Sequence, residues 1–288
     1  MQDISVPVVN TTINVWFRPP APSSPTVVLL HGLTGTSRWW SPVISHLPAN
    51  IGLVVPDIRG RGQSWGSAGP FDLKTIADDI GHCLDHFEVE ARTVIGYSMG
   101  AWVATLFGVR HPERLHNILL VDGGLPVEFD ASLETAEILD RMVGPAVARL
   151  GMEFESLETY LQFWKDHPAL ADRWHDDMAK VFAYDVQEVD TMWRVRGNNE
   201  AVVAGGSDMI FDDETVNSYR DLGVPTTLIT VDHGMLNEPG GFITPRAAAS
   251  AASLNANLEA TLLSDLNHYT LVVGDGAPSV ASMITVGL

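Results

Sequence analysis

The chain has 288 residues, of which 45% are hydrophobic and 18% charged, so it can bury one large α/β core or a core with a sizeable insertion. Its 36 acidic and 17 basic residues give a net charge of −19, which argues against a nucleic acid or an anionic membrane surface as partner. The single cysteine, Cys83, excludes an internal disulfide and a cysteine-rich metal site, and no run approaches the ~18 apolar residues of a membrane span.

The N-terminal residues predict a β-hairpin. Residues 3–18 alternate between apolar and polar side chains, and residues 10–12 (NTT) lie near the expected turn. The first ten residues contain neither a basic segment nor an apolar stretch of the signal-peptide type. We therefore expect a cytoplasmic protein.

Apolar runs alternate with helical patterns over much of the remaining chain. Strands buried on both faces are predicted at 26–30, 51–55, 93–95, 117–121, 226–231 and 260–263. Helices are predicted at 38–47, 71–88, 99–110, 244–258 and 277–285. This alternation predicts an α/β fold with a mostly parallel, twisted sheet and helices on both of its faces.

One long stretch interrupts the alternation. Residues 126–212 contain no convincing strand, and segments 132–150 and 157–164 have the amphipathic pattern of helices. We predict a helical cap at 126–212, inserted after the sixth strand of a core formed by 1–125 and 213–288. Such a cap would lie over the carboxyl ends of the strands, where open α/β sheets bind ligands. Its aromatic residues include Phe154, Phe163, Trp164, Trp174, Phe182 and Trp193.

The segment 96–100 (GYSMG) lies between a predicted strand and a predicted helix. A G-x-S-x-G sequence in this context is a nucleophile elbow, whose small flanking residues let the strand and the helix approach closely. The turn is sharp and strained, and it holds the Ser98 hydroxyl at the N-terminus of a helix, where the partial positive charge favours a developing anion. We therefore predict that Ser98 is a nucleophile.

A serine nucleophile also needs two donors for the oxyanion that forms on the substrate. One is expected to be the backbone N–H of Met99. The other is expected to be the N–H of Leu33, because Gly32 permits the turn that aims this amide after the strand at 26–30. We expect His31 to support the loop. The candidate substrate-binding residues are Trp39, Trp40 and Tyr97.

His268 is the predicted base, because it follows the last predicted strand with one helix left before the C-terminus. Two aspartates at strand ends are candidates to orient it. Asp122 follows the sixth strand, with paired glycines behind it to turn the chain. Asp232 ends the seventh strand but comes early, and an unusual segment at 233–241 follows it. We favour Asp122 as the acid and keep Asp232 as the alternative.

With these features in order, the chain resembles the α/β-hydrolase fold superfamily over nearly its whole length. That family has the order Ser, acid, His, and residues 55–64 (VPDIRGRGQS) look like its D-x-R-G-x-G-x-S segment, which implies structural roles for Asp57 and Arg59. Members similar to haloalkane dehalogenases carry the acid after the sixth strand, which supports Asp122. The commoner position, after the seventh strand, lacks its G-x-x-D segment here. Haloalkane dehalogenases and epoxide hydrolases use an aspartate nucleophile, so Ser98 argues against both activities.

The predicted function is a serine hydrolase of the carboxylesterase type, acting on an ester, lactone, thioester or amide of a small to medium, largely apolar substrate. One alternative is carbon–carbon bond hydrolysis in a vinylogous diketone by the same triad, for which a cationic pocket at Arg194 and Arg196 would be the sign. An alternative of another class is a ligand receptor that does not catalyse, or does so very slowly.

We expect no cofactor and no metal. His82 and His86 are four residues apart on one predicted helix, but they lie opposite its apolar face, so we interpret them as solvated. The expected partner is a small-molecule substrate, with no nucleic acid and no membrane. The sequence leaves open whether the protein is a monomer or a homodimer.

Overall fold

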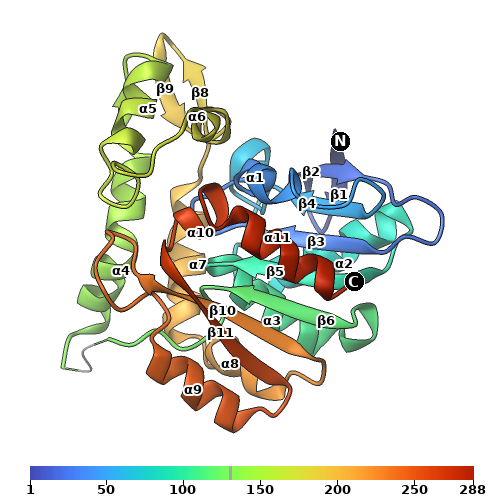
Figure 1. Ribbon diagram of the computed structural model, residues 1–288. Helices are drawn as coiled ribbons and strands as arrows, with labels where there is room; N and C mark the ends of the chain where they lie inside the picture. The colour runs from blue at the N-terminus through green and yellow to red at the C-terminus, as the bar shows by residue number, and fades with distance from the viewer. Residues whose placement is uncertain (130–131) are drawn as a thin grey trace.

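A twisted eight-stranded sheet forms the centre of the computed structural model, which describes residues 1–129 and 132–288 (Figure 1). Its strands are β1 (Gln2–Val8), β2 (Thr11–Arg18), β3 (Thr26–Leu30), β4 (Gly52–Pro56), β5 (Ala91–Tyr97), β6 (Asn117–Val121), β10 (Thr226–His233) and β11 (Leu258–Asn267). They lie in the order β1-β2-β4-β3-β5-β6-β10-β11. The hairpin β1–β2 is antiparallel and joins β4 antiparallel, and all other neighbours are parallel. The predicted hairpin and the mostly parallel sheet are confirmed.

Helices cover both faces of this sheet, as predicted (Figure 1). Alternate residues of each central strand enter different cores: Val28 and Leu30 of β3 pack on one side, and Val27 and Leu29 pack on the other. The first core includes residues of α2 (Leu73–Phe87), α3 (Met99–Arg110) and α9 (Pro245–Leu254), with α8 (Asp213–Asn217) against α3. The second core includes residues of α1 (Ser41–Ile44), α10 (Thr270–Val273) and α11 (Ala277–Val286). Short 3₁₀ helices lie at Ser37–Trp40, Gly62–Ser64, Pro112–Arg114 and Ser218–Asp221.

Three predicted elements differ from the structure by more than two residues or in kind. The helix predicted at 244–258 ends at Leu254, and Leu258 already begins β11. The strand predicted at 260–263 is part of the longer β11, whose middle residues are exposed rather than buried on both faces, because β11 is the edge strand of the sheet. The helix predicted at 38–47 is a 3₁₀ turn followed by the four-residue α1. Its aromatic start packs into the core in either geometry, so the apolar pattern did not distinguish them.

The segment between β6 and β10 contains a small sheet that the sequence did not predict. Its elements are α4 (Thr135–Leu150), β7 (Glu153–Phe154), α5 (Leu157–Lys165), α6 (Asp176–Ala183), β8 (Val186–Val189), β9 (Met192–Val195) and α7 (Asn199–Phe211), and the strand order is β7-β9-β8. The prediction of no strand at 126–212 is therefore wrong. The hairpin β8–β9 turns through Asp190 and Thr191, both with positive φ, which is not the Asn-Gly or Asp-Gly signal of such turns. Residues 130 and 131 of the predicted cap lie outside the described residues.

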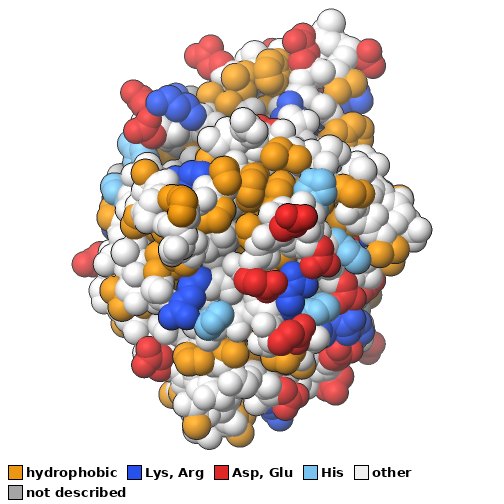
Figure 2. All heavy atoms as spheres, turned by 90° about the vertical axis from the view of Figure 1, so that its right-hand side faces the viewer, with side chains coloured by type: hydrophobic (Ala, Val, Ile, Leu, Met, Phe, Trp, Pro, Cys, Tyr) orange, Lys and Arg blue, Asp and Glu red, His pale blue; other side chains and the backbone are white. Residues whose placement is uncertain are grey.

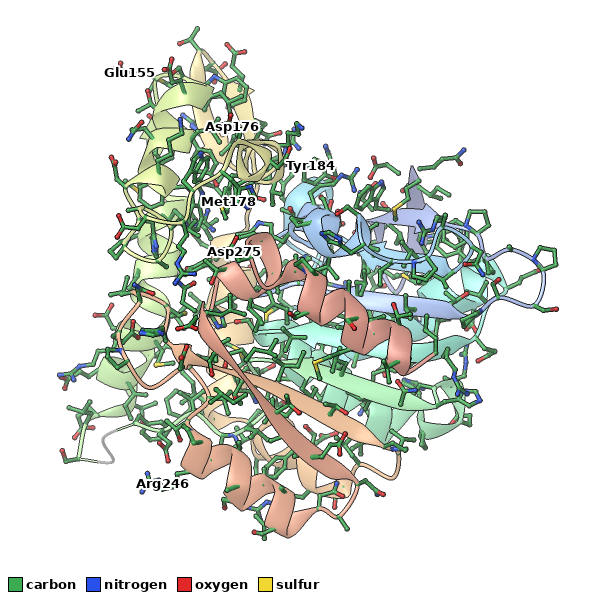
Figure 3. All side chains as sticks on the ribbon, viewed as in Figure 1. Glu155, Asp176, Met178, Tyr184, Arg246 and Asp275 are labelled. Atoms are coloured by element: carbon green, nitrogen blue, oxygen red, sulfur yellow. The ribbon has the colours of Figure 1, made fainter. Side chains whose placement is uncertain are left out.

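We call the described part of 126–212 the cap segment, and hydrogen bonds connect it to the core. The hydroxyl of Tyr184 donates to Asp57 at 2.8 Å. The buried carboxylate of Asp185 accepts from the Thr36 hydroxyl at 2.9 Å and from the Trp39 indole at 3.0 Å. Figure 3 shows Tyr184 between the cap segment and the N-terminal part of the core, and Met178 next to the end of α10. The cap segment is therefore held against the core near α1 and α10.

The acidic residues lie mainly on the surface. Figure 2 shows Asp and Glu side chains spread over one face of the molecule, several of them beside Lys or Arg. Among the ion pairs of the described residues, Arg110 pairs with Asp78 at 2.8 Å and with Glu214 at 3.4 Å. Within residues 1–129 and 132–288, no helix is long and apolar enough to span a bilayer.

Candidate active site

Ser98 occupies a sharp turn between the end of β5 and the start of α3, with φ 52° and ψ −124°. A Cβ at Gly96 would lie 2.1 Å from the carbonyl oxygen of Gly100, and a Cβ at Gly100 would lie 2.3 Å from the carbonyl oxygen of Leu30. Only glycine fits at both positions, because backbone atoms leave no room for a side chain. The turn therefore has the close packing, and Ser98 the strained backbone, that the GYSMG sequence predicts.

The carboxyl ends of four parallel strands meet at this turn. Leu33 follows β3, Ser98 follows β5, Asp122 follows β6, and His268 follows β11. Three of these residues, Leu33, Ser98 and His268, line one cavity of about 220 Å³. Its other walls come from the cap segment and from the loop after β10.

His268 is hydrogen-bonded to Asp122, and both side chains are buried. The ring Nδ1 lies 2.7 Å from Asp122 Oδ2. The other carboxylate oxygen, Oδ1, accepts from the backbone N–H of Ile243 at 3.2 Å. A carboxylate oxygen accepts hydrogen bonds, so this contact places a ring proton on Nδ1 and leaves Nε2 on the side of the ring away from Asp122.

Asp232 has other partners. Its carboxylate accepts from the backbone N–H groups of Asp265 at 3.0 Å and Leu266 at 3.3 Å, and the ring of His233 lies 3.0 Å away. It ties the end of β10 to the end of β11. In the part of the chain that the structure describes, Asp232 makes no hydrogen bond to His268. The loop after β10 contributes the N–H of Ile243 to Asp122 instead of a carboxylate to His268.

His31 sets the orientation of the peptide that carries the Leu33 N–H. Its Nε2 accepts from the backbone N–H of Ile58 at 2.9 Å, so Nδ1 must be the donor to the carbonyl of Gly32 at 2.8 Å. Burial lowers the pKa of His31 to about 4, so the ring is neutral at pH 7. Fixing the Gly32 carbonyl on one side directs the N–H of the same planar peptide, that of Leu33, to the opposite side. The N–H of Met99 is the first of α3 and has no carbonyl within the helix to bond.

The three predicted substrate-binding aromatic residues occupy different positions. Trp39 and Tyr97 line the cavity, and the Tyr97 hydroxyl also donates to the backbone carbonyl of His268 at 3.0 Å. Trp40 is fully buried in the core beside Tyr97 and is not part of the cavity wall. The prediction of Trp40 as a substrate-binding residue is therefore corrected. Trp40 follows Trp39 in a tight 3₁₀ turn, and this turn directs the two side chains in different directions.

The D-x-R-G-x-G-x-S residues make buried structural contacts. Asp57 accepts from the backbone N–H groups of Ser37 at 2.7 Å and Gln63 at 2.9 Å. Arg59 forms a two-pronged ion pair with Asp79, with distances of 2.9 and 2.7 Å. These contacts hold the loop behind the cavity, in agreement with the structural roles that the resemblance implies.

The site also contains residues that no sequence motif indicated. The ring of Phe242 lies 5.1 Å from that of His268, and Arg149 and His167 of the cap segment line the cavity. Arg194 and Arg196, the sequence candidates for a cationic pocket, are not in the wall: the first pairs with Glu153 across two strands of the small sheet, and the second donates to a backbone carbonyl. His82 and His86 lie on α2 and belong to no metal-binding group of three His, Cys, Asp or Glu among the described residues.

Comparison with known proteins agrees with this fold. The profile of the family described as alpha/beta hydrolase fold matches residues 25–144. An uncharacterized protein of Mycobacterium bovis is 29% identical over 104 residues, which are 36% of this chain and 30% of that protein. The chain spans less than half the length of the first curated relatives that it matches.

Two further similarities cover most of the chain. The putative carbamate hydrolase RutD of Shigella flexneri is 23% identical over 229 residues, which are 79% of this chain and 85% of that protein. The crystal structure of an E-2-(acetamidomethylene)succinate hydrolase superposes with a TM-score of 0.82 at 19% identity, over 99% of this chain and 98% of the other.

Proposed function

Because the chain belongs to the α/β-hydrolase fold superfamily, we propose that it is a serine hydrolase that cleaves a carboxylic ester, lactone, thioester or amide through an acyl-enzyme on Ser98. The observation that carries the proposal is the buried bond from His268 to Asp122, beside a cavity that Ser98 lines from a strained turn. Strain at a nucleophile and a buried His–Asp pair are costly features that a merely structural loop does not need.

The first half of the reaction transfers the acyl group to the enzyme. His268 Nε2 takes the hydroxyl proton of Ser98 while Oγ attacks the substrate carbonyl. The negative charge then develops on the carbonyl oxygen and is stabilised by the N–H groups of Leu33 and Met99. Asp122 stabilises the imidazolium ring, which gives its proton to the leaving alcohol, thiol or amine.

The second half hydrolyses the acyl-enzyme. His268 takes a proton from water, the water oxygen attacks the acyl carbon, and the proton returns to Ser98 Oγ as the carboxylic acid leaves. The size of the cavity, about 220 Å³, supports a small or medium substrate. The similarity to a putative carbamate hydrolase and to an E-2-(acetamidomethylene)succinate hydrolase supports acyl–nitrogen bonds as well as esters.

Carbon–carbon bond hydrolysis of a vinylogous diketone is the second candidate, since Arg149 gives the cavity the cationic wall that such a substrate's carboxylate needs. Turnover of a vinylogous diketone, compared with 4-nitrophenyl esters, decides between the two bond types.

A fluorophosphonate probe with peptide mass spectrometry tests the proposal. We expect rapid labelling of Ser98, loss of labelling in Ser98→Ala and His268→Ala, and hydrolysis of 4-nitrophenyl acetate or butyrate that these variants lack. A folded parent in which Ser98 is neither labelled nor needed for turnover would overturn the proposal and favour the receptor alternative.

A further inference from the structure

The charge of the cavity wall is opposite to that of the chain as a whole. The chain has 36 acidic and 17 basic residues. The described residues that line the cavity, however, include two arginines and two histidines, and no Asp or Glu is among them. Most of the remaining wall is apolar, from side chains such as Trp39, Phe163 and Met209. Such a wall attracts an anionic ligand, because it contains cationic side chains and no carboxylate that would repel the ligand.

Two of the three arginines that are buried in the described chain have complete sets of partners. Arg59 pairs with the carboxylate of Asp79. Arg61 donates from Nε, Nη1 and Nη2 to three backbone carbonyls, those of Leu33, Arg59 and Ala201. Neither guanidinium lines the cavity, so both act within the structure itself.

Arg149, the third buried arginine, differs from these two in its position and in its partners. It lies at the end of α4, lines the cavity and is 6% exposed. Nη1 donates to the Tyr160 hydroxyl and Nη2 to the carbonyl of Thr34, both at 3.1 Å, and the guanidinium lies 5.1 Å from the ring centre of Trp164. Within the described residues, it has no carboxylate partner at ion-pair distance and Nε has no acceptor. A buried guanidinium seldom lacks a counter-charge, because removing it from water is costly.

The acidic group that hydrogen bonds connect to Arg149 is a weak counter-charge. Asp185 is reached through the Tyr160 hydroxyl, at 3.5 Å from its carboxylate. Burial raises the pKa of Asp185 to about 7, although the charge of Arg149 acts against this rise. The carboxyl is therefore partly protonated at neutral pH. Arg141, the other cationic wall residue, is well exposed and already pairs with Glu137 at 2.7 Å.

His167 offers a second donor beside Arg149. Its Nδ1 accepts from the backbone N–H of Ala169 at 3.3 Å, which places the ring proton on Nε2. Burial, and then the charge of Arg149, lower the pKa of His167, so its ring is neutral at pH 7. The same charge acts on Tyr269, the neighbour of His268. The core thus supplies the reactive groups, and the cap segment supplies unused donors on the other wall.

We propose that Arg149 binds a carboxylate of the substrate, with His167 as a second donor, so that the enzyme's substrates are small esters or amides with a carboxylate at one end. This inference rests on the proposed hydrolase function and names its substrate class. It revises the largely apolar substrate of the sequence analysis into one with an apolar body and an anionic end. A guanidinium suits this task because its planar fork matches the two oxygens of a carboxylate.

Matched pairs of substrates test the inference. The mono(4-nitrophenyl) ester of adipate, whose carboxylate is on the acyl group, is compared with 4-nitrophenyl hexanoate. 4-Acetoxybenzoate, whose carboxylate is on the leaving group, is compared with its methyl ester. The variants are Arg149→Met, Arg149→Lys and the control Arg246→Met. Figure 3 places Arg246 on α9, where it pairs with Glu128 at the surface.

We expect the parent to favour at least one carboxylate substrate in kcat/KM. Arg149→Met should reduce that preference by about 10- to 100-fold, the value of hydrogen bonds to a charged group. Arg149→Lys should keep part of the preference, and Arg246→Met should keep all of it. Free adipate should slow fluorophosphonate labelling of the parent Ser98, and adipamide should not, which tests the site even where a variant fails to fold.

Two results would overturn the inference. In the first, the parent's Ser98 is labelled, but the parent shows no preference for carboxylate substrates and adipate does not protect Ser98. In the second, a folded Arg149→Met loses the same fraction of kcat/KM on charged and on neutral substrates. In both, Ser98 remains reactive and the hydrolase proposal stands. An unlabelled Ser98 with no turnover of any ester is instead the failure of the hydrolase proposal.

Discussion

Substituting Asp122 by Asn changes one buried hydrogen bond and separates the two candidate acids. Asp122 Oδ2 lies 2.7 Å from His268 Nδ1, and Oδ1 accepts from the N–H of Ile243 at 3.2 Å. An asparagine has one acceptor and one donor at these two places. If its oxygen faces Ile243, its NH₂ faces His268 and forces the ring proton onto Nε2. If the amide is flipped, its oxygen accepts from His268 and its NH₂ faces the N–H of Ile243, so that two donors point at each other.

The first orientation removes the base, because His268 with its proton on Nε2 cannot take the proton of Ser98. The turned orientation would keep the base, but it is disfavoured because it leaves a buried N–H donor unpaired beside Ile243. We expect kcat/KM to fall by about 10³- to 10⁴-fold, which corresponds to about 4–5.5 kcal/mol of transition-state stabilisation. The matched control is Asp232→Asn. The Asp232 carboxyl is about a third exposed, and among the described residues its partners are the neighbouring His233 and the end of β11. We expect this variant to stay within about threefold of the parent, because it loses only hydrogen bonds worth about 1 kcal/mol each.

The assay combines kcat/KM for 4-nitrophenyl acetate with the rate of fluorophosphonate labelling, and thermal unfolding shows that both variants are folded. A folded Asp122→Asn that keeps more than about a tenth of the parent's activity would refute the role of Asp122 as the acid. A thousandfold loss in Asp232→Asn alone would move the acid to the end of β10.

Three further variants test other parts of the account. Gly100→Ala places a Cβ 2.3 Å from the Leu30 carbonyl oxygen and should cost about 3 kcal/mol or more in urea unfolding, whereas Gly223→Ala, with nothing within 4 Å, should be near neutral; equal effects would contradict the steric reason. Arg61→Met removes the donor that holds the oxyanion loop from behind and should lower kcat about tenfold with little change in KM, so an unchanged kcat counts against that support. The pKa of His31 falls from about 6.5 in the unfolded chain to about 4 on burial, so its contribution of about 3 kcal/mol is complete above pH 6.5 and is lost as the pH falls through 4. Urea unfolding from pH 7 to pH 4 should show this loss in the parent and not in His31→Gln, and parallel profiles would refute it.

Local sequence was sufficient where the chemistry is local. The elbow at Ser98 needs two glycines and a strand-to-helix boundary, all within a few residues, and the Leu33 loop follows directly from a buried strand. The place of His268 followed from chain order alone. Trp40 could not be separated from Trp39, because neighbouring residues of a tight turn differ only in direction.

Long-range contacts decided the rest. The sequence left two acids because the choice depends on the path of the loop after β10, which brings Ile243 to Asp122. Arg149 belongs to no motif, and its position depends on how α4 packs over the carboxyl ends of the strands. The β8–β9 hairpin was missed because its strands have four residues each and its turn lacks the usual glycine.

The acyl-enzyme itself is the most direct test of the account. The parent is mixed with excess 4-nitrophenyl acetate, quenched in acid within the first turnovers, and digested for peptide mass spectrometry. We predict one acetyl group on the peptide that contains Ser98, formed at the rate of 4-nitrophenol release and absent in Ser98→Ala. Release of 4-nitrophenol by the parent with no acetyl group on Ser98, or with the group on another residue, would contradict the account.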